Sequence, residues 1–178
     1  MNTRYLFQSD RLGFRNWRDE DLQAFAPINE DPEVMAHFPN TLNTRESADF
    51  IHRMTAHFEQ HGYTYFATEL LETKELIGFI GLCNQDYEAP FNPATDIGWR
   101  LKKSAWGKGY TTEGSKRCLD YAFQELNIEK VVSVCTKNNI KSENVMRKIG
   151  MTKQGTFNHP KLKNHPELEA CVWYETVK

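Results

Sequence analysis

The sequence of 178 residues has few cysteines, and their spacing excludes the usual cysteine-based frameworks. There are four of them, far apart, and none forms a Cys-x-x-Cys pair. We therefore expect small buried side chains in a reduced protein, without disulfides or a cysteine-bound metal. The four are Cys83, Cys118, Cys135 and Cys171.

Long hydrophobic runs are also missing. The longest nearly unbroken apolar run, residues 76–83, is far shorter than the roughly 18 residues that a membrane-spanning helix needs. Residues 1–10 show no basic start followed by an apolar stretch, so no secretory signal is expected. These absences predict a cytoplasmic protein that does not cross a membrane.

An excess of positive charge is absent as well. The chain has 22 Lys and Arg against 24 Asp and Glu, a net charge of -2, so we expect no nucleic-acid partner. A chain of this length buries roughly 70% of the surface that it exposes when unfolded, and it needs no covalent staple. With 39% apolar residues, the composition predicts a single domain over residues 1–178.

Hydrophobic periodicity predicts a mixed α/β domain. The predicted strands are residues 11–17, 63–70, 76–83, 96–101, 131–136, 152–157 and 168–176. A short first helix is predicted to begin near residue 18, and three further helices are predicted over residues 45–61, 112–126 and 140–149. Thr44 is the predicted N-cap of the helix over residues 45–61, and Gly62 is its predicted C-terminal stop. The connection between residues 63–70 and 76–83 is short enough to make these strands an antiparallel hairpin, and at least one βαβ crossover follows later in the chain.

Residues 96–113 combine a strand, a glycine-containing turn and a helix start. Gly107 and Gly109 let the backbone approach an anion, and the following helix adds the positive end of its dipole. A plain strand-to-helix turn explains the glycines equally well. Two familiar phosphate loops are excluded, because Lys102 stands where a Walker loop needs Gly and Thr112 where a dinucleotide fingerprint needs its third Gly.

Several segments together resemble a known family. They are Ile97-Gly98-Trp99, the run from Trp106 to Glu113, Asn139-x-x-Ser142 and the run from Lys148 to Met151. They are similar to the GNAT acetyltransferase superfamily, in particular its ribosomal-protein N-acetyltransferase-like (RimJ/RimL-like) branch, and the similarity extends from Arg11 to Tyr174. The resemblance implies a GNAT fold: a splayed mixed sheet of about seven strands with four helices, opened between its fourth and fifth strands.

By that resemblance, acetyl-CoA is the co-substrate and lies in the V-shaped gap. Backbone amides of residues 107–112 would hold its pyrophosphate, although Trp106 and Thr111 depart from the residue types of the family motif. The amide N–H of Leu101 would act as an oxyanion donor. Asn139, locally a helix N-cap, would also contact the cofactor arm. The implied cofactor-binding residues are Leu101, Trp106, Gly107, Lys108, Gly109, Tyr110, Thr111, Thr112, Asn139 and Ser142.

The resemblance also implies two catalytic residues. Ser142 would donate a proton to the departing thiolate, as this position can in the resembling branch. Many family members instead use a Tyr four residues later, and that position is Met146 here, which cannot donate. A thiol with a pKa of about 8.5 leaves tolerably well without strong acid help. Asp96 is the candidate base for the amine, and a strand-edge charge is its alternative role. Glu113 suits the helix dipole.

Two weaker constellations have ordinary explanations. His57 and His61 have an i, i+4 spacing, but no third ligand is apparent and no metal is expected. Basic residues flank the implied cofactor site and could attract its phosphates, although surface charge explains each one singly. They are Lys102, Lys103, Lys108, Lys141, Arg147 and Lys148.

The predicted function is an acetyl-CoA-dependent N-acetyltransferase in which a primary amine attacks the thioester directly. The expected acceptor is a protein N-terminus or a small-molecule amine. The helices of the first half and residues 157–168 are expected to line the acceptor side, and the protein is expected to be a monomer or a homodimer. The alternative is a non-catalytic acyl-CoA-binding or partner-binding module on the same fold, which Met146 favours.

Overall fold

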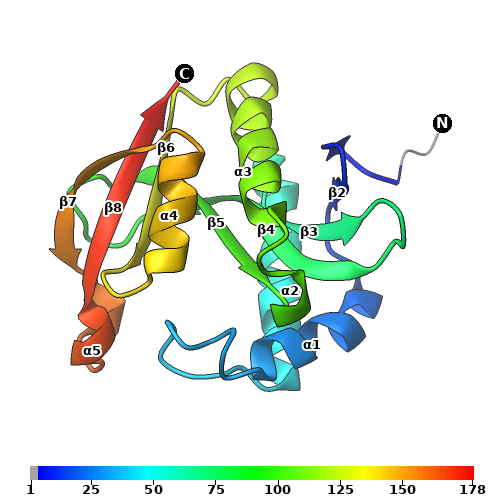
Figure 1. The fold of residues 1–178 in the computed structure, drawn as a ribbon, viewed down its shortest axis with the longest axis horizontal. Coiled ribbons are helices and arrows are strands. Elements are labelled where there is room, and N and C mark those ends of the chain that lie inside the picture. The colour runs from blue at the N-terminus through cyan, green and yellow to red at the C-terminus, as the bar shows by residue number, and fades with distance from the viewer. Residues whose placement is uncertain (1–3) are drawn as a thin grey trace.

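The computed structural model describes residues 4–178, and its central element is one sheet of eight strands (Figure 1). The strand order is β1-β2-β3-β4-β5-β6-β8-β7, antiparallel throughout except for the parallel pair β5 and β6. The strands are β1 Phe7–Gln8, β2 Leu12–Arg15, β3 Tyr65–Leu70, β4 Leu76–Gln85, β5 Ala94–Leu101, β6 Lys130–Thr136, β7 Thr152–Asn158 and β8 Ala170–Val177. The helices are α1 Leu22–Glu30, α2 Thr44–His61, α3 Tyr110–Asp120, α4 Ile140–Lys148 and α5 Pro166–Glu169.

The predicted mixed α/β architecture is confirmed, and the differences lie in short elements and element ends. The two-residue strand β1 and the four-residue helix α5 are additional. Pro166 begins α5, so the last strand starts at Ala170 rather than at residue 168. Within residues 4–178, no helix is long and apolar enough to cross a membrane.

The predicted N-cap of α2 is wrong by one residue. Asn43 is the cap, because its side chain accepts the Glu46 N–H at 2.9 Å while the Glu46 carboxylate accepts the Asn43 N–H at 2.8 Å. This reciprocal pair is a capping box, and Thr44 is the first helical residue.

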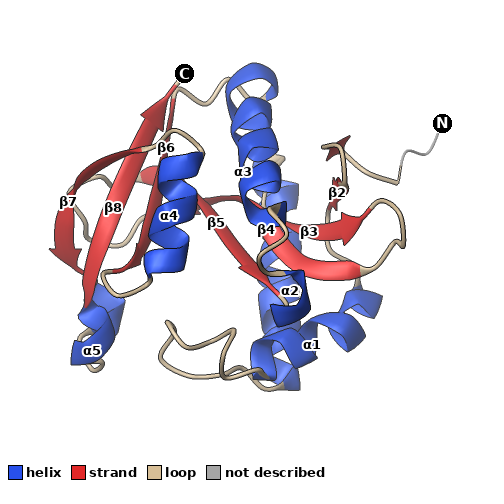
Figure 2. Ribbon diagram, in the orientation of Figure 1, coloured by secondary structure: helices blue, strands red, loops and turns tan. Residues whose placement is uncertain are grey.

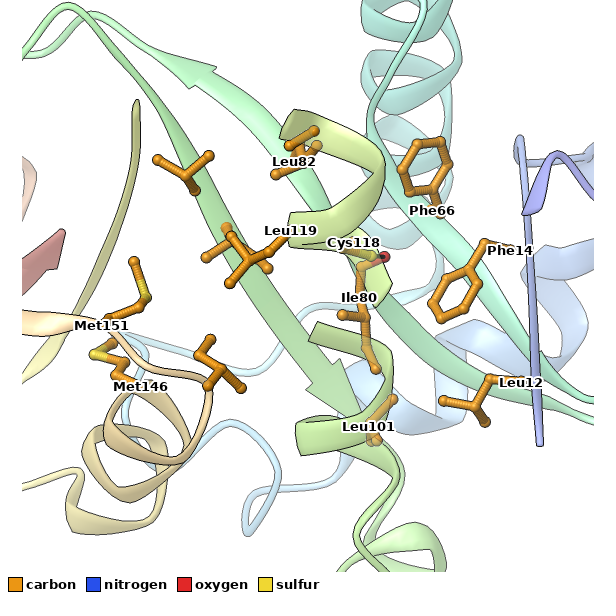
Figure 3. Packing of buried hydrophobic residues seen from close by; sticks show 14 of the residues in the cluster. Leu12, Phe14, Phe66, Ile80, Leu82, Leu101, Cys118, Leu119, Met146 and Met151 are labelled. Atoms are coloured by element: carbon orange, nitrogen blue, oxygen red, sulfur yellow. Dashed lines mark hydrogen bonds between the residues drawn. The ribbon is translucent and has the colours of Figure 1, made fainter. Parts of the chain in front are cut away.

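The sheet separates two hydrophobic cores. The helices that cover its faces are drawn in Figure 2. Side chains of β4 alternate between them: Ile80 and Leu82 lie on the side of α3 and α4, whereas Phe79 packs with residues of α1 and α2. Figure 3 shows Cys118 and Leu119 of α3 over Ile80 and Leu82. The four cysteines are free and buried, as predicted. Burial raises the pKa of Cys83 to about 12 and that of Cys171 to about 11.

Strands β5 and β6 separate soon after they meet. They pair only at Thr95 with Val131 and at Asp96 with Val132, although β5 stays paired with β4 as far as Leu101 and β6 stays paired with β8 as far as Thr136. The sheet therefore opens between these strands (Figure 1). They correspond to the fourth and fifth predicted strands, because the additional strand β1 raises the number of each later strand by one. The predicted position of the divergence is therefore confirmed.

Two loops span the opened sheet on the side of α1 and α2. Residues 31–43, between α1 and α2, reach the end of β6, where His37 Nδ1 lies 3.4 Å from Thr136 Oγ1 (Figure 1). Residues 86–93, between β4 and β5, place Phe91 against Phe157 and Trp173 of β7 and β8. These loops connect the two halves where the sheet itself no longer does.

Candidate functional site

The edge of β5 directs unpaired backbone groups into the opening. The Lys102 N–H donates to Ile77 of β4 at 2.9 Å. Hydrogen bonding alternates along an antiparallel pair, so the N–H groups of Leu101 and Trp99 turn away from β4 toward β6. The Leu101 amide therefore faces the opening, and its role as an oxyanion donor stays a prediction. The Trp99 amide is a second donor that the sequence analysis missed.

Trp106 ties the glycine loop to the end of β5. Its indole Nε1–H donates to the Leu101 carbonyl at 2.9 Å, and the Lys141 ammonium lies 4.7 Å from its ring centroid. Trp106, which departs from the residue type of the family motif, therefore has a structural role. Its indole N–H satisfies the Leu101 carbonyl, which faces away from β4 and toward the loop.

The loop forms an uncapped cradle at the start of α3. Gly107 and Gly109 have φ of +72° and +80°, which favour glycine, and they turn the chain into the helix. Asn43 caps α2 and Asn139 caps α4, but the N-cap of α3 is Gly109 and offers no side chain. The first N–H groups of α3 have no intrahelical partner. Residues 107–112 therefore fit an anion such as a pyrophosphate.

Arg11, at the start of β2, holds this cradle in place. Its Nη1 donates to the Lys108 carbonyl at 3.1 Å, and its guanidinium lies 4.5 Å from the Tyr110 ring centroid. Its Nε donates to the Glu113 carboxylate at 2.7 Å, and Ser9 Oγ donates to the same group at 2.7 Å. Burial opposes ionisation of Glu113, but these hydrogen bonds outweigh it and lower its pKa. Glu113 thus does more than the predicted dipole role.

The predicted basic rim is only partly available to a ligand. Lys102 pairs with Glu75, Lys103 with Glu33, and Arg147 with Glu143. Lys141 lies over Trp106 beside the cradle, and Lys108 belongs to the cradle itself, so these two members lie near an anion bound there.

The N-terminus of α4 presents Ser142 to the opening. The Asn139 side chain accepts the Ser142 N–H at 3.1 Å, which confirms the predicted capping contact. Trp99 Nε1 lies 3.3 Å from Ser142 Oγ, and an indole N–H can only donate. The serine oxygen is therefore the acceptor, and its own O–H is directed elsewhere. Met146 is 1% exposed and packs into the core near Met151 (Figure 3).

Asp96 lies on the opposite face of β5, toward α1 and α2. Tyr65 donates to its carboxylate at 2.6 Å and Gln85 Nε2 lies at 3.4 Å. Burial raises the pKa of Asp96 to about 7, although these hydrogen bonds favour the charged form. Such a carboxylate changes charge near neutral pH and can accept a proton there. Sequence reasoning named Asp96 but had no signal for Tyr65 or Gln85.

His57, the first residue of the predicted histidine pair, has a structural role in this fold. His57 Nδ1 lies 2.8 Å from the Tyr63 carbonyl oxygen, and its Nε2 accepts the Asn84 N–H at 3.1 Å. Both ring nitrogens are thus engaged with backbone. Residues 4–178 contain no group of three or more His, Cys, Asp or Glu side chains placed to hold a metal ion.

Comparison with known proteins matches this geometry to a family. The family model described as an acetyltransferase (GNAT) domain matches residues 11–152. The uncharacterised N-acetyltransferase YnaD of Bacillus subtilis is 30% identical over 148 residues, which cover 83% of this chain and 82% of that protein.

Two solved structures share the fold. A GNAT-family acetyltransferase from Bacillus anthracis gives a TM-score of 0.80 at 24% identity, covering 96% of both chains. The ribosomal α-N-protein acetyltransferase RimL, in complex with coenzyme A, gives 0.75 at 17% identity over 95% of both chains. The resemblance to the ribosomal-protein branch is therefore also a similarity of fold. The matched segment runs from the start of β2 to β7 and includes the cradle, the opening and α4, so this chain belongs to the GNAT family of N-acetyltransferases.

Proposed function

We propose that the protein transfers an acetyl group from acetyl-CoA to a primary amine, with an α-amino group as its preferred acceptor. The observation that carries this proposal is the opening in the sheet. An anion cradle lies at one of its faces, a carboxylate lies on the other face, and two backbone N–H groups line the edge between them.

The residues present fit acetyl-CoA. The uncapped N-terminus of α3 and residues 107–112 would hold the pyrophosphate, and Lys141 and Asn139 stand beside the path from the cradle to the opening. Bound there, acetyl-CoA supplies an activated thioester to the opening.

Each remaining role falls to a residue at the opening. The N–H groups of Leu101 and Trp99 donate to the carbonyl oxygen as negative charge develops on it. Asp96 accepts the proton that the amine nitrogen loses when it bonds to the acetyl carbon. Ser142 donates a hydrogen bond to the sulfur that leaves with the electron pair of the broken C–S bond. Met146 lies in the core, so its lack of a hydroxyl does not argue for a non-catalytic module.

The pKa of the acceptor amine selects its class. An α-amino group with a pKa of about 8 is roughly 10% unprotonated at pH 7, whereas a lysine amine is less than about 0.1% unprotonated. A base with a pKa of about 7 gives only moderate help. An α-amino group needs less of that help, which supports this acceptor.

The cradle is tested by Gly109→Asp with Gly62→Asp as a matched control. Both glycines have φ near +80°, but Gly62 ends α2 and has no heavy atom within 4 Å of an added Cβ. We expect Gly109→Asp to weaken acetyl-CoA binding at least about tenfold, because it places a negative charge beside the pyrophosphate position. Calorimetry measures this. Wild-type affinity in a folded Gly109→Asp variant would remove the loop from the cofactor site.

The role of Ser142 is tested by Ser142→Ala and Trp99→Phe. The first should lower kcat about 100-fold or less, with little change in KM for acetyl-CoA. The second keeps an aromatic ring but removes the N–H that engages Ser142 Oγ, so it should lower kcat less and add no further loss to Ser142→Ala. Steady-state kinetics of the double-mutant cycle decide this. A loss confined to acetyl-CoA affinity would make Ser142 a binding residue.

The role of Asp96 is tested by the pH dependence of Asp96→Asn. Wild-type activity should rise through pH about 7 as the carboxylate ionises, whereas the variant should retain activity with its profile shifted to higher pH. The neighbouring Tyr65, Cys83 and Tyr87 have raised pKa values and stay neutral in this range, and burial lowers the pKa of His159. Peptides with a free N-terminus, or with only a free lysine, are compared by mass spectrometry.

Thermal unfolding supplies a control for Asp96 that does not depend on activity. The pKa is raised in the folded state, so wild-type stability should fall as pH rises from about 4 to about 7, and Asp96→Asn should lack this component. Identical pH profiles for wild type and variant, or acetylation confined to lysine, would refute the assignment.

A further inference from the structure

Arg100 lies on the same face of β5 as Asp96, on the opened segment of that strand. Gly98 stands between them, and the Tyr65 ring covers it so closely that an added Cβ would lie 3.0 Å from the ring. The two charged residues are four positions apart, which is about 13 Å along a strand. The Asp96 carboxylate accepts a hydrogen bond from the Tyr65 hydroxyl. Asp96 therefore does not neutralise Arg100.

The Arg100 guanidinium is buried without an anionic partner. Only 8% of the residue is exposed. Its Nη1 donates to Asn29 Oδ1 at 2.7 Å, and the neutral Asn29 amide in turn donates to Ser47 Oγ at 3.0 Å. Arg100 Nε is buried and has no hydrogen-bond partner. No carboxylate in residues 4–178 lies within ion-pair distance of Arg100.

Aromatic rings surround this cation. Its Cζ lies 4.3 Å from the centroid of Phe38, 5.4 Å from Phe79 and 5.8 Å from Phe50. Ring faces attract a guanidinium, but they do not replace the in-plane acceptors that its N–H groups require. Phe38 belongs to the loop of residues 31–43 and is 40% exposed, so the nearest of these three rings to the cation also reaches solvent.

We propose that Arg100 binds a carboxylate of the acceptor molecule, so that the enzyme prefers amines that carry a nearby carboxylate and discriminates against polycationic amines. This inference rests on the proposed function and specifies its substrate class. The edge formed by Nε and Nη2 has the fork geometry that binds a carboxylate through two parallel hydrogen bonds. A bound carboxylate offsets the cost of a buried unpaired charge, whereas a second cation adds to it.

Two acidic residues of the loop that contains Phe38 are engaged with other partners. Glu33, on the same loop as Phe38, is paired with Lys103. Asp31 accepts backbone N–H groups of its own turn. The carboxylate that Arg100 lacks is thus not supplied by these acidic residues of the loop that covers it.

The carboxylate can come from two sources, which matched acceptors distinguish. One pair is alanine and alaninamide, which differ in the α-carboxylate beside the amine and are compared at equal concentrations of unprotonated amine, because that carboxylate also raises the pKa of the amine. The other set is three amidated tetrapeptides that begin with alanine and have aspartate, asparagine or lysine as second residue. If the acceptor's own α-carboxylate is recognised, we expect kcat/KM to be at least about tenfold higher for alanine than for alaninamide. If a neighbouring side chain is recognised, we expect the same ratio between the aspartate and asparagine peptides, and the lysine peptide should be the poorest acceptor.

Two variants assign the preference to Arg100. Arg100→Gln should reduce the carboxylate preference to less than about threefold without changing KM for acetyl-CoA, and Arg100→Lys should retain part of it, because charge remains but the fork is lost. Arg53→Gln is the control: Arg53 lies 5.9 Å from the same Phe50 ring but is exposed, so its loss should leave the preference unchanged. Equal kcat/KM for acids and amides in the wild-type enzyme overturns the proposal even if Arg100→Gln fails to fold.

Binding of the acetylated peptides separates this proposal from the proposed function. Calorimetric titration of the CoA-loaded protein with the acetylated aspartate and asparagine peptides measures recognition without turnover. Preferential binding of the acid, lost in Arg100→Gln, supports the carboxylate site even if no peptide is acetylated. Acetylation without any carboxylate preference leaves the proposed function standing and refutes the role of Arg100.

Discussion

The loss of pairing between β5 and β6 after Asp96 is the constraint on which the site depends. Unpaired strand edges are costly, because each leaves backbone donors and acceptors without partners. Here side chains replace part of the missing ladder: Ser133 Oγ donates to the Ile97 carbonyl at 2.9 Å and Trp106 Nε1 to that of Leu101. The carbonyls are satisfied in this way, and the N–H groups of Trp99 and Leu101 remain for a ligand.

The two-residue period of β5 distributes the functions between the faces of the sheet. Trp99 and Leu101 point to the side of α3 and α4, where the cradle and Ser142 lie. Asp96 and Arg100 point to the side of α1 and α2, where the two long loops span the opening. Because successive side chains of a strand alternate, this eight-residue strand presents residues of the proposed acetyl-CoA site on one face and residues of the proposed acceptor site on the other.

The same strand places charges in unusual environments. Asp96 has tyrosine and glutamine neighbours but no cation, so burial raises its pKa to about 7. Arg100 has an amide and three aromatic rings but no anion, and burial lowers its pKa to about 10. Both groups thus have neutral partners on the face toward α1 and α2, and charged groups perturbed in this way are typical of functional sites.

Much of this protein follows from local sequence. Apolar periodicity identifies the main strands and helices, Gly107 and Gly109 mark the cradle, and Asn139 marks the start of α4, because these features depend on residues close together in the chain. Only the tertiary structure decides that Trp99 engages Ser142, that Arg11 holds the cradle through Glu113, and that Arg100 meets Asn29 rather than an acid. These contacts join residues 43, 102 and 71 positions apart. The hydrogen bonds, desolvation and charge pairing of these side chains depend on which residues from distant parts of the sequence lie next to them in the folded chain. Local sequence patterns do not determine those neighbours.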